Sequence, residues 1–586
     1  LIIVVVFVPL FTLESMEGKM FKPLALTICF ALIGSLVATL TIVPVLGSIM
    51  VKRTTGGDGD DNFLIRSIHR LYMPMLAAAV RGRWITIAVA AAVMVVSFSV
   101  LPKIGTEFLP PLNEGAVAIN VVRLPTASIK GSVLQTSEIE KRLLAKFPEV
   151  ETVVSKTGRA EIAEDPMGPE QNDIFVMLKP DYESKFGRSR EEMVQAIDRE
   201  LSVFPGIKPA FSQPIALRVN ELISGIKSDV AIKIFGDDIE VLRTTAEKIA
   251  PILSGIEGAS DVKIEQISGF SQIELHMNRQ AMARHMINIE AINLLVKTAI
   301  GGSVATTVFE GQKRFDVQVR FPLENRRDID VIEQMLVPSP AGYNVPLGEL
   351  VTIEEGEVPA QISREDSTRR LIVECNVRGR DMGSFVAEAQ QLLASIENDL
   401  PEGYRLVWGG QFENQQRAMK RLKMVVPAAI LLIFLMLFCS LNSFKSAILI
   451  LVNLPFALIG GILAIYFLDI NLSVAASVGF IALLGVAVEN GLVLVSFFDQ
   501  LRAGGKKVYE AVIEACRLRV RPLMMTTLTT LAGLLPMLYA SGSGSEIQQP
   551  LVAVIFGGLI SSLCVTLIIL PVLYILFNRD KAIVEY

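Results

Sequence analysis

One stretch of the chain combines an ionisable side chain with a long apolar sequence. Residues 472–498 are apolar almost throughout and are long enough to cross a bilayer. Glu489 lies near the middle of this stretch, and Asn490 follows it. A carboxylate at the bilayer centre costs about 2.5–3.5 kcal/mol, so it normally faces a bundle interior or a water-filled path, where it can carry a proton. The alternative is a buried carboxyl group that joins neighbouring helices by hydrogen bonds. The stretch indicates a membrane transporter.

The elements that must position Glu489 are further apolar spans on either side of a long polar region. The predicted spans are 24–50, 84–101, 424–441, 446–467, 523–540 and 549–577, and residues 1–10 are the tail of another. A hydrophobic content of 51% and a mean hydropathy of +0.48 exceed those of soluble proteins, yet 20% of residues are charged. We therefore expect a membrane bundle, in contact with the lipid bilayer, and a large external domain.

The distribution of charge predicts how the chain is oriented across the membrane. Segments 51–83 and 499–521 are rich in Lys and Arg, which predicts that both are cytoplasmic. In the resulting division, residues 1–50 form two membrane helices, 51–83 a cytoplasmic linker and 84–101 another span. Residues 102–420 are periplasmic. Residues 421–577 form five spans with a cytoplasmic loop at 499–521, and 578–586 are a cytoplasmic tail. The net charge of −5, without a basic tract, predicts no nucleic-acid partner.

An internal repeat relates the two ends of the chain. A shift of 527 residues places Pro9 on Pro536, Pro23 on Pro550 and Pro44 on Pro571, and segments 32–46 and 559–573 agree at ten of fifteen positions. We expect an internally duplicated protein, because parallel repeats are a known transporter design. The chain starts within an apolar run, without Met, so we interpret it as an N-terminally truncated fragment.

The polar region alternates strand-like and helix-like segments. Strands are predicted at 116–123, 150–156, 230–236, 260–266, 271–276, 370–379 and 404–410, with helices at 132–146, 238–254, 279–299 and 383–397. The β-α-β-β-α order predicts α+β, ferredoxin-like βαβ units. No HExxH, CxxC or P-loop motif is present to suggest a hydrolytic enzyme or direct use of ATP.

Several stretches together resemble the heavy-metal efflux branch of the resistance-nodulation-division (RND) exporters. They are GTEFLPPLNEG (105–115), LRVNELISGIKSDVAIKIFGDD (217–238), NRQAMARHMINIEAI (278–292), GGQFENQQRA (409–418), VGFIALLGVAVENG (478–491) and RLRVRPLMMT (517–526). The resemblance implies a homotrimeric pump of the Gram-negative inner membrane with periplasmic porter and docking modules. It also implies a periplasmic membrane-fusion adaptor, an outer-membrane channel, no cofactor, and export of cations in exchange for protons.

The resemblance assigns proton coupling to three residues. Glu489 occupies the position that faces the proton-relay aspartates of the other half in these pumps, and Asn490 follows it. Thr526 matches a relay threonine of the drug exporters. Drug exporters typically carry a lysine at the position of Glu489, so the carboxylate favours the metal branch. Leu523 stands where copper and silver exporters carry a lysine.

The same resemblance bears on the cargo. Copper(I) and silver(I) exporters of this branch use three methionines, which suit soft ions. Gln171, Glu221 and Ile287 take those places here, with Met167 and Met286 near two of them. Harder donors predict a divalent ion such as zinc, cobalt, nickel or cadmium. The candidate ligands are Glu164, Asp165, Asp173, Glu221, Asp229, His285 and Met286.

Other interpretations stay open for both the residues and the chain. Acidic side chains on an external domain are mostly solvated surface, and His285 can also serve only to cap or pack. The cargo can be copper(I), silver(I) or an organic amphiphile, although aromatic residues make up only 7% of the chain. A protein-export accessory factor and a periplasmic metal sensor are further alternatives; the duplicated module disfavours the first and Glu489 the second.

Overall fold

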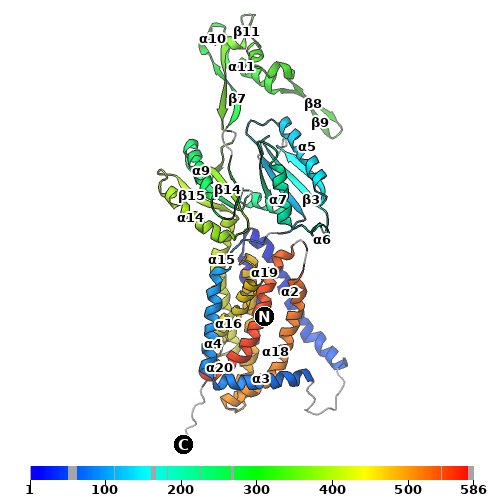
Figure 1. Ribbon diagram of the computed structural model, residues 1–586, viewed down its shortest axis with the longest axis vertical. Helices are drawn as coiled ribbons and strands as arrows, with labels where there is room; N and C mark the ends of the chain where they lie inside the picture. Colours follow the sequence, from blue (N-terminus) through cyan, green and yellow to red (C-terminus); the bar gives the residue numbers. More distant parts are fainter. Residues whose placement is uncertain are drawn as a thin grey trace.

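The computed structural model describes residues 2–578 except 51–62, 111, 160–166, 181, 225, 227, 266–268, 360, 541 and 543. The molecule is elongated, with a helical bundle at one end, two α/β modules next to it and a smaller module at the far end (Figure 1). Glu164, Asp165 and most of the predicted tail, 579–586, lie outside the described residues.

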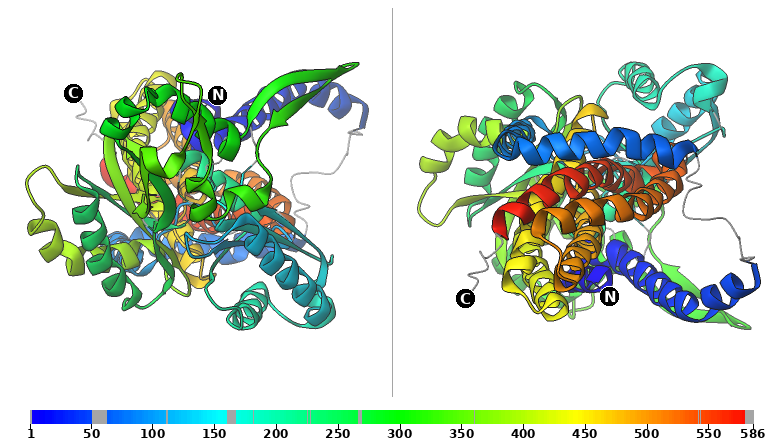
Figure 2. Two further views of the ribbon diagram at one scale, coloured as in Figure 1. Left: turned by 90° about the horizontal axis from the view of Figure 1, so that it is seen from above. Right: turned by 90° about the horizontal axis from the view of Figure 1, so that it is seen from below.

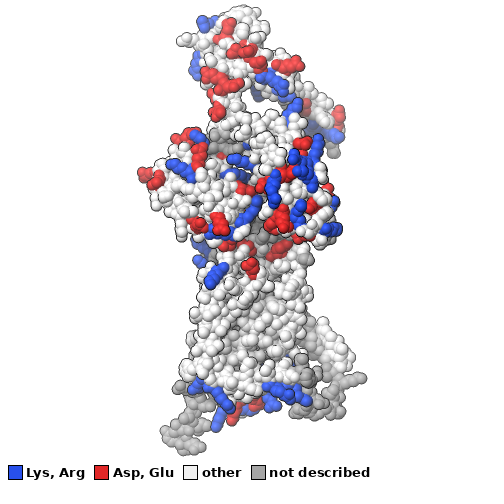
Figure 3. Space-filling view, in the orientation of Figure 1, with Lys and Arg blue, Asp and Glu red and all other residues white. Residues whose placement is uncertain are grey.

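The bundle is built from helices, most of which are long and apolar. They are α1 (Ile2–Phe7) with the 3-10 turn η1 (Val8–Thr12), α2 (Ser15–Met50), α3 (Phe63–Arg81), α4 (Arg83–Val100), α15 (Gln411–Leu441), α16 (Phe444–Phe467), α17 (Val474–Ala503), α18 (Val508–Leu538), α19 (Ser545–Cys564), the π-helical turn η5 (Val565–Ile569) and α20 (Leu570–Phe577). Six segments of the described chain are long and apolar enough to cross a membrane: Gly18–Met50, Arg83–Lys103, Gln411–Leu441, Phe444–Phe467, Val474–Ala503 and Ser545–Phe577. Figure 3 shows the corresponding band of the surface to be almost free of charged residues.

Small residues bring the central helices together. A side chain at Gly460 of α16 would collide with the backbone of Gly557 on α19, and a side chain at Gly557 would collide with Gly460 in turn. Nearby, the Ser561 hydroxyl accepts a hydrogen bond from the Gly460 amide at 3.1 Å and donates one to the Ala457 carbonyl at 2.7 Å. In lipid the hydrophobic effect does not drive helices together, so their association depends on close packing of this kind.

Two predicted segments of the bundle differ in the structure. Residues 499–521 were predicted to form a loop but are mostly helical, because α17 continues to Ala503 and α18 begins at Val508. Lys and Arg are good helix formers, so the basic cluster did not mark a helix end. Residues 523–538 of the predicted span 523–540 belong to α18, which runs beside α19 (Figure 1) but is not among the six apolar segments. Four threonines and Arg521 lower its hydropathy.

The described part of the predicted linker 51–83 is the helix α3. It lies across the end of the bundle that is opposite the α/β modules (Figure 1). Tyr72, Leu76 and Val80, which are four residues apart, are buried against the bundle, and the Tyr72 hydroxyl donates to the Leu567 carbonyl at 2.8 Å. The amphipathic spacing therefore makes this segment a docked helix.

Helix α2 contacts the bundle only near its start. Phe21, Ala25 and Cys29 are buried, whereas Leu40 and Ile49 are 70% and 73% exposed. Figure 2 shows the rest of the helix projecting away from the other helices. The shift of 527 residues carries α2 onto residues 542–577, and the observed helix there runs from Ser545 to Phe577.

The first module is a four-stranded antiparallel sheet covered by helices. Its elements are β1 (Ala116–Val122), α5 (Ile129–Lys146), β2 (Val150–Thr157), β3 (Gln171–Leu178), α6 (Tyr182–Phe186), α7 (Arg190–Leu201) and β4 (Lys208–Ser212). The strand order β2-β3-β1-β4 is that of a ferredoxin-like βαββαβ unit. Alternate residues such as Val117, Ile119 and Val121 enter the core beneath α5 and α7.

The second module has the same order but is interrupted in sequence. Its elements are β5 (Val230–Phe235), α9 (Ile239–Ser254), β6 (Ala259–Ile264), β13 (Arg364–Glu365), β14 (Thr368–Val377), α14 (Met382–Asn398) and β15 (Arg405–Gly410). β14 lies between β6 and β5, and β15 pairs with the other edge of β5. The predicted strand 271–276 is not part of this sheet, because residues 270–358 form the distal module.

The distal module is carried on a two-stranded ribbon of β7 (Phe270–Met277) and β12 (Val351–Val358). Its other elements are α10 (Arg279–Arg284), α11 (Ile289–Val296), the π-helical turn η3 (Lys297–Gly301), β8 (Ser303–Glu310), β9 (Lys313–Val319), η4 (Leu323–Arg326), α12 (Ile329–Glu333), β10 (Leu336–Pro338), β11 (Asn344–Pro346) and α13 (Leu347–Leu350). The predicted helix 279–299 is broken, because Met286 adopts a left-handed conformation with φ of 55°.

Candidate functional site

Glu489 lies on the one uncovered stripe of an otherwise buried helix. The neighbouring Val488 and Asn490 are buried, but Glu489 is exposed, as are Val493 and Ser496 at helical spacing after it. No hydrogen bond or ion pair joins the Glu489 carboxylate to the part of the chain that the structure describes.

Two glycines define the faces of α17 around Glu489. A side chain at Gly485 would contact Ile3 and Val6 of α1, and a side chain at Gly491 would contact Ile450 and Leu570. Glu489 is four residues after Gly485, so it shares the α1 face one turn further along, where that short helix no longer covers α17. The carboxylate thus points away from α16 and α20.

Thr526 lies on α18, the next helix in sequence, and is also exposed. Its hydroxyl bonds within its own helix, to the carbonyls of Pro522 at 3.2 Å and Leu523 at 3.1 Å. Leu523, at the position of the copper-exporter lysine, is buried. No hydrogen bond within the described residues joins Thr526 to Glu489, so this chain places the two groups on consecutive helices without linking them.

Sequence reasoning missed a buried polar group deeper in the bundle. Asn453 of α16 donates to the Thr566 hydroxyl at 3.5 Å, and both side chains are fully buried. Thr566 lies in the π-helical turn η5, and π-helical turns are frequent at functional sites. The signal was available, since Asn453 is a lone amide in an apolar span, as Asn490 is.

In the external region, Asp173 belongs to a polar chain between the two modules. Its Oδ1 accepts a hydrogen bond from Asn120 Nδ2 at 2.7 Å, and Asn120 Oδ1 accepts one from Lys263 Nζ at 3.2 Å. Lys263 also pairs with Glu374 at 3.1 Å. Asp173 and Asn120 are buried in the first module, whereas Lys263 and Glu374 belong to the second.

Asp229 uses both carboxylate oxygens within the second module. Oδ1 accepts from Gln411 Nε2 at 3.0 Å, and Oδ2 accepts from the Val377 amide at 3.2 Å. Burial raises the pKa of Asp229, although the hydrogen bond from Val377 lowers it. Asp229 therefore joins the start of β5 to β14 and to the first residue of α15.

Glu221 lies on the helix that connects the two modules, α8 (Pro214–Ser224). It is partly buried, and its Oε2 pairs with Arg218 Nη1 at 2.7 Å. The amides of Ile215 and Ala216, at the start of the helix, donate to Glu114 at 2.6 and 3.0 Å. Glu221 thus lies between the two modules, on a helix whose first residues are held by Glu114.

The remaining positions belong to two different modules. Gln171 begins β3 in the first module, and Met167, four residues earlier, is only 2% exposed. His285 and Met286 follow α10 in the distal module (Figure 1). His285 Nδ1 lies 3.1 Å from the Tyr343 hydroxyl, and Met286 is 60% exposed.

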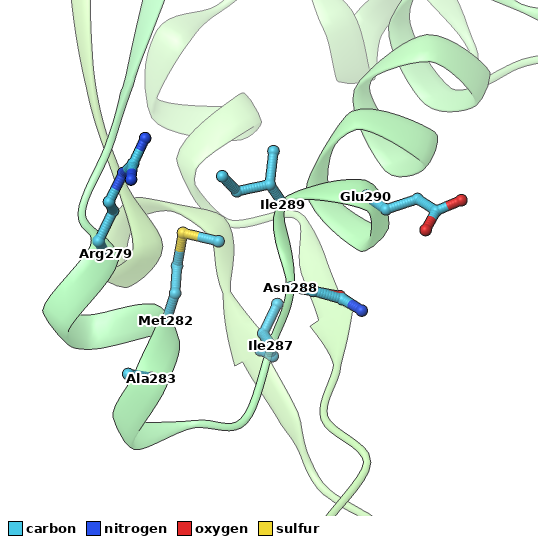
Figure 4. A pocket seen from close by; sticks show the side chains of 7 residues that line it. All are labelled: Arg279, Met282, Ala283, Ile287, Asn288, Ile289 and Glu290. Atoms are coloured by element: carbon cyan, nitrogen blue, oxygen red, sulfur yellow. The ribbon is translucent and has the colours of Figure 1, made fainter.

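Ile287 faces a shallow hollow of about 470 Å³ on the distal module (Figure 4). Met282, Ile287 and Ile289 form its apolar wall, with Arg279 and Glu290 at its rim. His285 and Met286 do not line this hollow. Within the described residues, no three His, Cys, Asp or Glu side chains are grouped closely enough to hold a metal ion.

Comparison with known proteins gives the family. The model of the AcrB/AcrD/AcrF family matches residues 1–578. The chain belongs to this family. Cation efflux system protein CzcA of Alcaligenes sp. (strain CT14) is 42% identical to this family member over 585 residues, covering 99% of this chain and 55% of that protein. Nickel and cobalt resistance protein CnrA of Cupriavidus metallidurans is 38% identical over 579 residues, which are 98% of this chain and 53% of that protein.

A third relative has a lower identity to this chain. Cation efflux system protein CusA of Escherichia coli (strain K12) is 31% identical over 587 residues, covering 98% of this chain and 56% of that protein. An X-ray crystal structure of a heavy metal efflux pump, crystal form II, superposes with a TM-score of 0.85 at 32% identity, over 98% of this chain and 57% of that one. This AcrB/AcrD/AcrF chain spans about half the length of the curated relatives it matches.

Proposed function

We propose that the protein carrying this chain exports divalent heavy-metal cations in exchange for protons. The observation that carries the proposal is Glu489, an uncovered carboxylate halfway along a helix that is otherwise buried in an apolar bundle. A carboxylate at this depth is a coupling group by default, and each charge moved gains about 2.3 kcal/mol per 100 mV of membrane potential. Asn490 and Thr526 are proposed to support the proton transfer at Glu489.

The choice of divalent ions rests on donors and on relatives. Met167 is buried and Met286 lies on the distal module, so no set of three methionines suited to copper(I) is supported. Similarity is also higher to cobalt-zinc-cadmium resistance protein CzcA, at 42%, than to CusA, at 31%. We propose Glu221 as the first ligand on the path, because its helix connects the two modules, so a movement of one module relative to the other would change its surroundings.

The other candidate ligands receive different proposed roles. Asp173 and Asp229 would hold the modules in place, since their carboxylates are engaged by Asn120 and by Gln411 and Val377. Asp165, which lies outside the described residues, is proposed as a further ligand. His285 and Met286 would form a separate, distal contact for the ion.

The proposed assembly follows the family. The pump would be an internally duplicated homotrimer in the Gram-negative inner membrane, joined to a periplasmic adaptor and an outer-membrane channel. The porter modules, including residues 116–212, would be periplasmic, with α3 and the connection from α17 to α18 on the cytoplasmic side. The agreement of helix bounds between α2 and residues 545–577 supports the duplication.

A growth assay tests the cargo. The complete gene product carrying this chain would be expressed with its adaptor in a metal-sensitive strain and challenged with zinc, cobalt, nickel, cadmium, copper and silver. Protection against divalent ions alone is expected. Protection against copper and silver alone, or dye efflux without metal resistance, would overturn the proposal in favour of a soft-ion or an amphiphile exporter.

A further inference from the structure

The segment 105–108, which links α4 to the first module, is hydrogen-bonded to the start of α17. The Leu472 amide donates to the Gly105 carbonyl at 2.8 Å, and the Glu107 amide donates to the Leu472 carbonyl at 3.3 Å. The Val474 amide, in the first turn of α17, donates to the Phe108 carbonyl at 3.3 Å. These bonds form a short parallel ladder fifteen residues before Glu489 on the same helix.

Side chains reinforce this ladder. Asn471 Nδ2 donates to Glu107 Oε2 at 3.0 Å. On either side of the ladder, Ile104 and Phe108 are 7% and 3% exposed and pack into the apolar bundle. The segment is therefore fixed to the membrane helices by both polar and apolar contacts.

The same segment is bonded to the second module. The Thr106 amide donates to Asp381 Oδ2 at 3.2 Å, and Asp381 also caps α14 by accepting from the Ser384 amide at 2.9 Å. This contact is closely packed. A side chain at Gly105 would collide with Asn471 and Asp381, and a side chain at Gly383 would collide with Thr106. The Asp381 side chain thus caps the start of a helix of the second module and also holds the segment attached to α17.

The first module is attached to a different membrane helix. The Asn113 amide, three residues before β1, donates to Glu546 Oε1 at 3.2 Å in the first turn of α19. The second module is therefore bonded to α17 through segment 105–108 and is continuous with α15, whereas the first module, which follows that segment in the chain, is bonded to α19. A displacement of α17 relative to α19 would change the angle between the modules on either side of Glu221.

We propose that segment 105–108 transmits movement of α17 to the second module, with Asn471, Glu107 and Asp381 as its positioning residues. The inference rests on the proposed function, because it takes the state of Glu489 as the source of the movement. It goes further by naming the physical connection between the membrane carboxylate and the external modules.

The test measures two distances by pulsed electron paramagnetic resonance in the complete gene product. Spin labels at exposed Lys141 on α5 and Gln391 on α14 report the angle between modules. Labels at exposed Lys445 and Gln500 report the position of α17 relative to α16 at the far end of the bundle. Movement is triggered by Glu489→Gln, which fixes the group in a neutral form.

With the link intact, Glu489→Gln should shift both distances. In Asn471→Ala or Glu107→Ala, Glu489→Gln should still shift the bundle distance, while the module distance stays unchanged. With Glu489 intact, each of these two variants should lower metal export about tenfold. Glu107→Gln keeps an oxygen acceptor for Asn471 and should behave as wild type. So should Asp469→Asn, an exposed position in the same loop where Asn also tolerates the left-handed φ of 53°.

Each other outcome overturns the inference. If the module distance still responds in Asn471→Ala and Glu107→Ala, the segment is not the transmitter. If both distances cease to respond and thermal stability falls, the residues are merely structural. If Glu489→Gln shifts neither distance in the intact protein, the coupling role of Glu489 fails with it, which separates failure of the proposed function from failure of the link alone.

Discussion

Carboxylates of the external modules and of the membrane bundle differ in how far other groups engage their oxygens. In the modules, Asp229 accepts two hydrogen bonds, and Asp261 accepts from the Phe211 amide at 3.2 Å and from Asn376 Nδ2 at 2.9 Å and pairs with Arg378. In the bundle, Glu489 faces outward with no such contact among the described residues, although Asp499 on the same helix pairs with Tyr574.

This difference separates groups that hold the fold from a group that is available for chemistry. A carboxylate whose oxygens accept hydrogen bonds from the protein must rearrange those bonds before it can bind an ion. A carboxylate on an uncovered stripe has no such bonds to rearrange. The comparison teaches that position in an apolar segment is not enough, and that the state of the oxygens must be known as well.

The largest expected effect is at Glu489. Glu489→Gln in the complete gene product should reduce metal resistance to that of cells lacking the gene, because the amide cannot exchange a proton. Minimum inhibitory concentrations for zinc and cobalt measure this. Glu510→Gln, an exposed acid in the first turn of α18, is the matched control and should keep full resistance. Unchanged resistance in Glu489→Gln would show that the uncovered carboxylate of the bundle has no role in transport, so the two regions would not differ in this respect.

Asp261 should show the opposite behaviour, with a large effect on stability. Asp261→Ala removes the acceptor of Arg378 and the nearer of the two acceptors of Asn376 Nδ2, at a position with φ of 54°, so we expect the free energy of unfolding to fall by about 3 kcal/mol. Hydrogen exchange of the β4 and β6 amides should accelerate roughly a hundredfold. Asp261→Asn, which keeps an acceptor and tolerates the backbone, should lose much less. Equal protection in both variants would show that the carboxylate does not hold the modules together.

Glu221 tests whether a paired external carboxylate can also bind cargo. Glu221→Gln should raise the KM for zinc export about fivefold and leave kcat unchanged, as expected for loss of a ground-state ligand. Arg218→Gln removes the ion-pair partner and should not raise KM. Transport in proteoliposomes measures both. An equal rise in the two variants would mean that the ion pair, and not metal binding, is what matters at this position.

The smallest expected effect is a change in the pH dependence of stability at Asp229. Its pKa is raised in the folded state, so the folded protein binds this proton more tightly than the unfolded chain does. Its contribution to stability is complete below the unfolded pKa of about 3.9 and is lost as the pH rises through the folded value.

Protection of the Val377 amide against hydrogen exchange, corrected for intrinsic rate, should therefore decrease from pH 5 to pH 7. Asp229→Asn should show a weaker decrease. If wild type and variant change in parallel, the proton on Asp229 does not contribute to the stability of the second module.

Much of the local structure follows from short patterns in the sequence. The alternation of 116–123 and 230–236 predicted β1 and β5 to within a residue or two, because a period of two needs no knowledge of the rest of the chain. Apolar length likewise predicted most membrane helices. The pattern failed at 499–521, where the basic residues predict a loop but the chain is mostly helical. It also failed at 279–299, where the left-handed Met286 interrupts the predicted helix.

The sequence by itself therefore determined the family, the apolar helices, the alternating strands and the presence of a single carboxyl group in the middle of α17. The tertiary structure alone decided that β14 returns to lie between β5 and β6, and that Asp229 is engaged while Glu489 is not. It also decided that Asn471 and Asp381 meet at one segment. The physical reason is that local periodicity fixes which way a side chain points, whereas its partners come from residues hundreds of positions away.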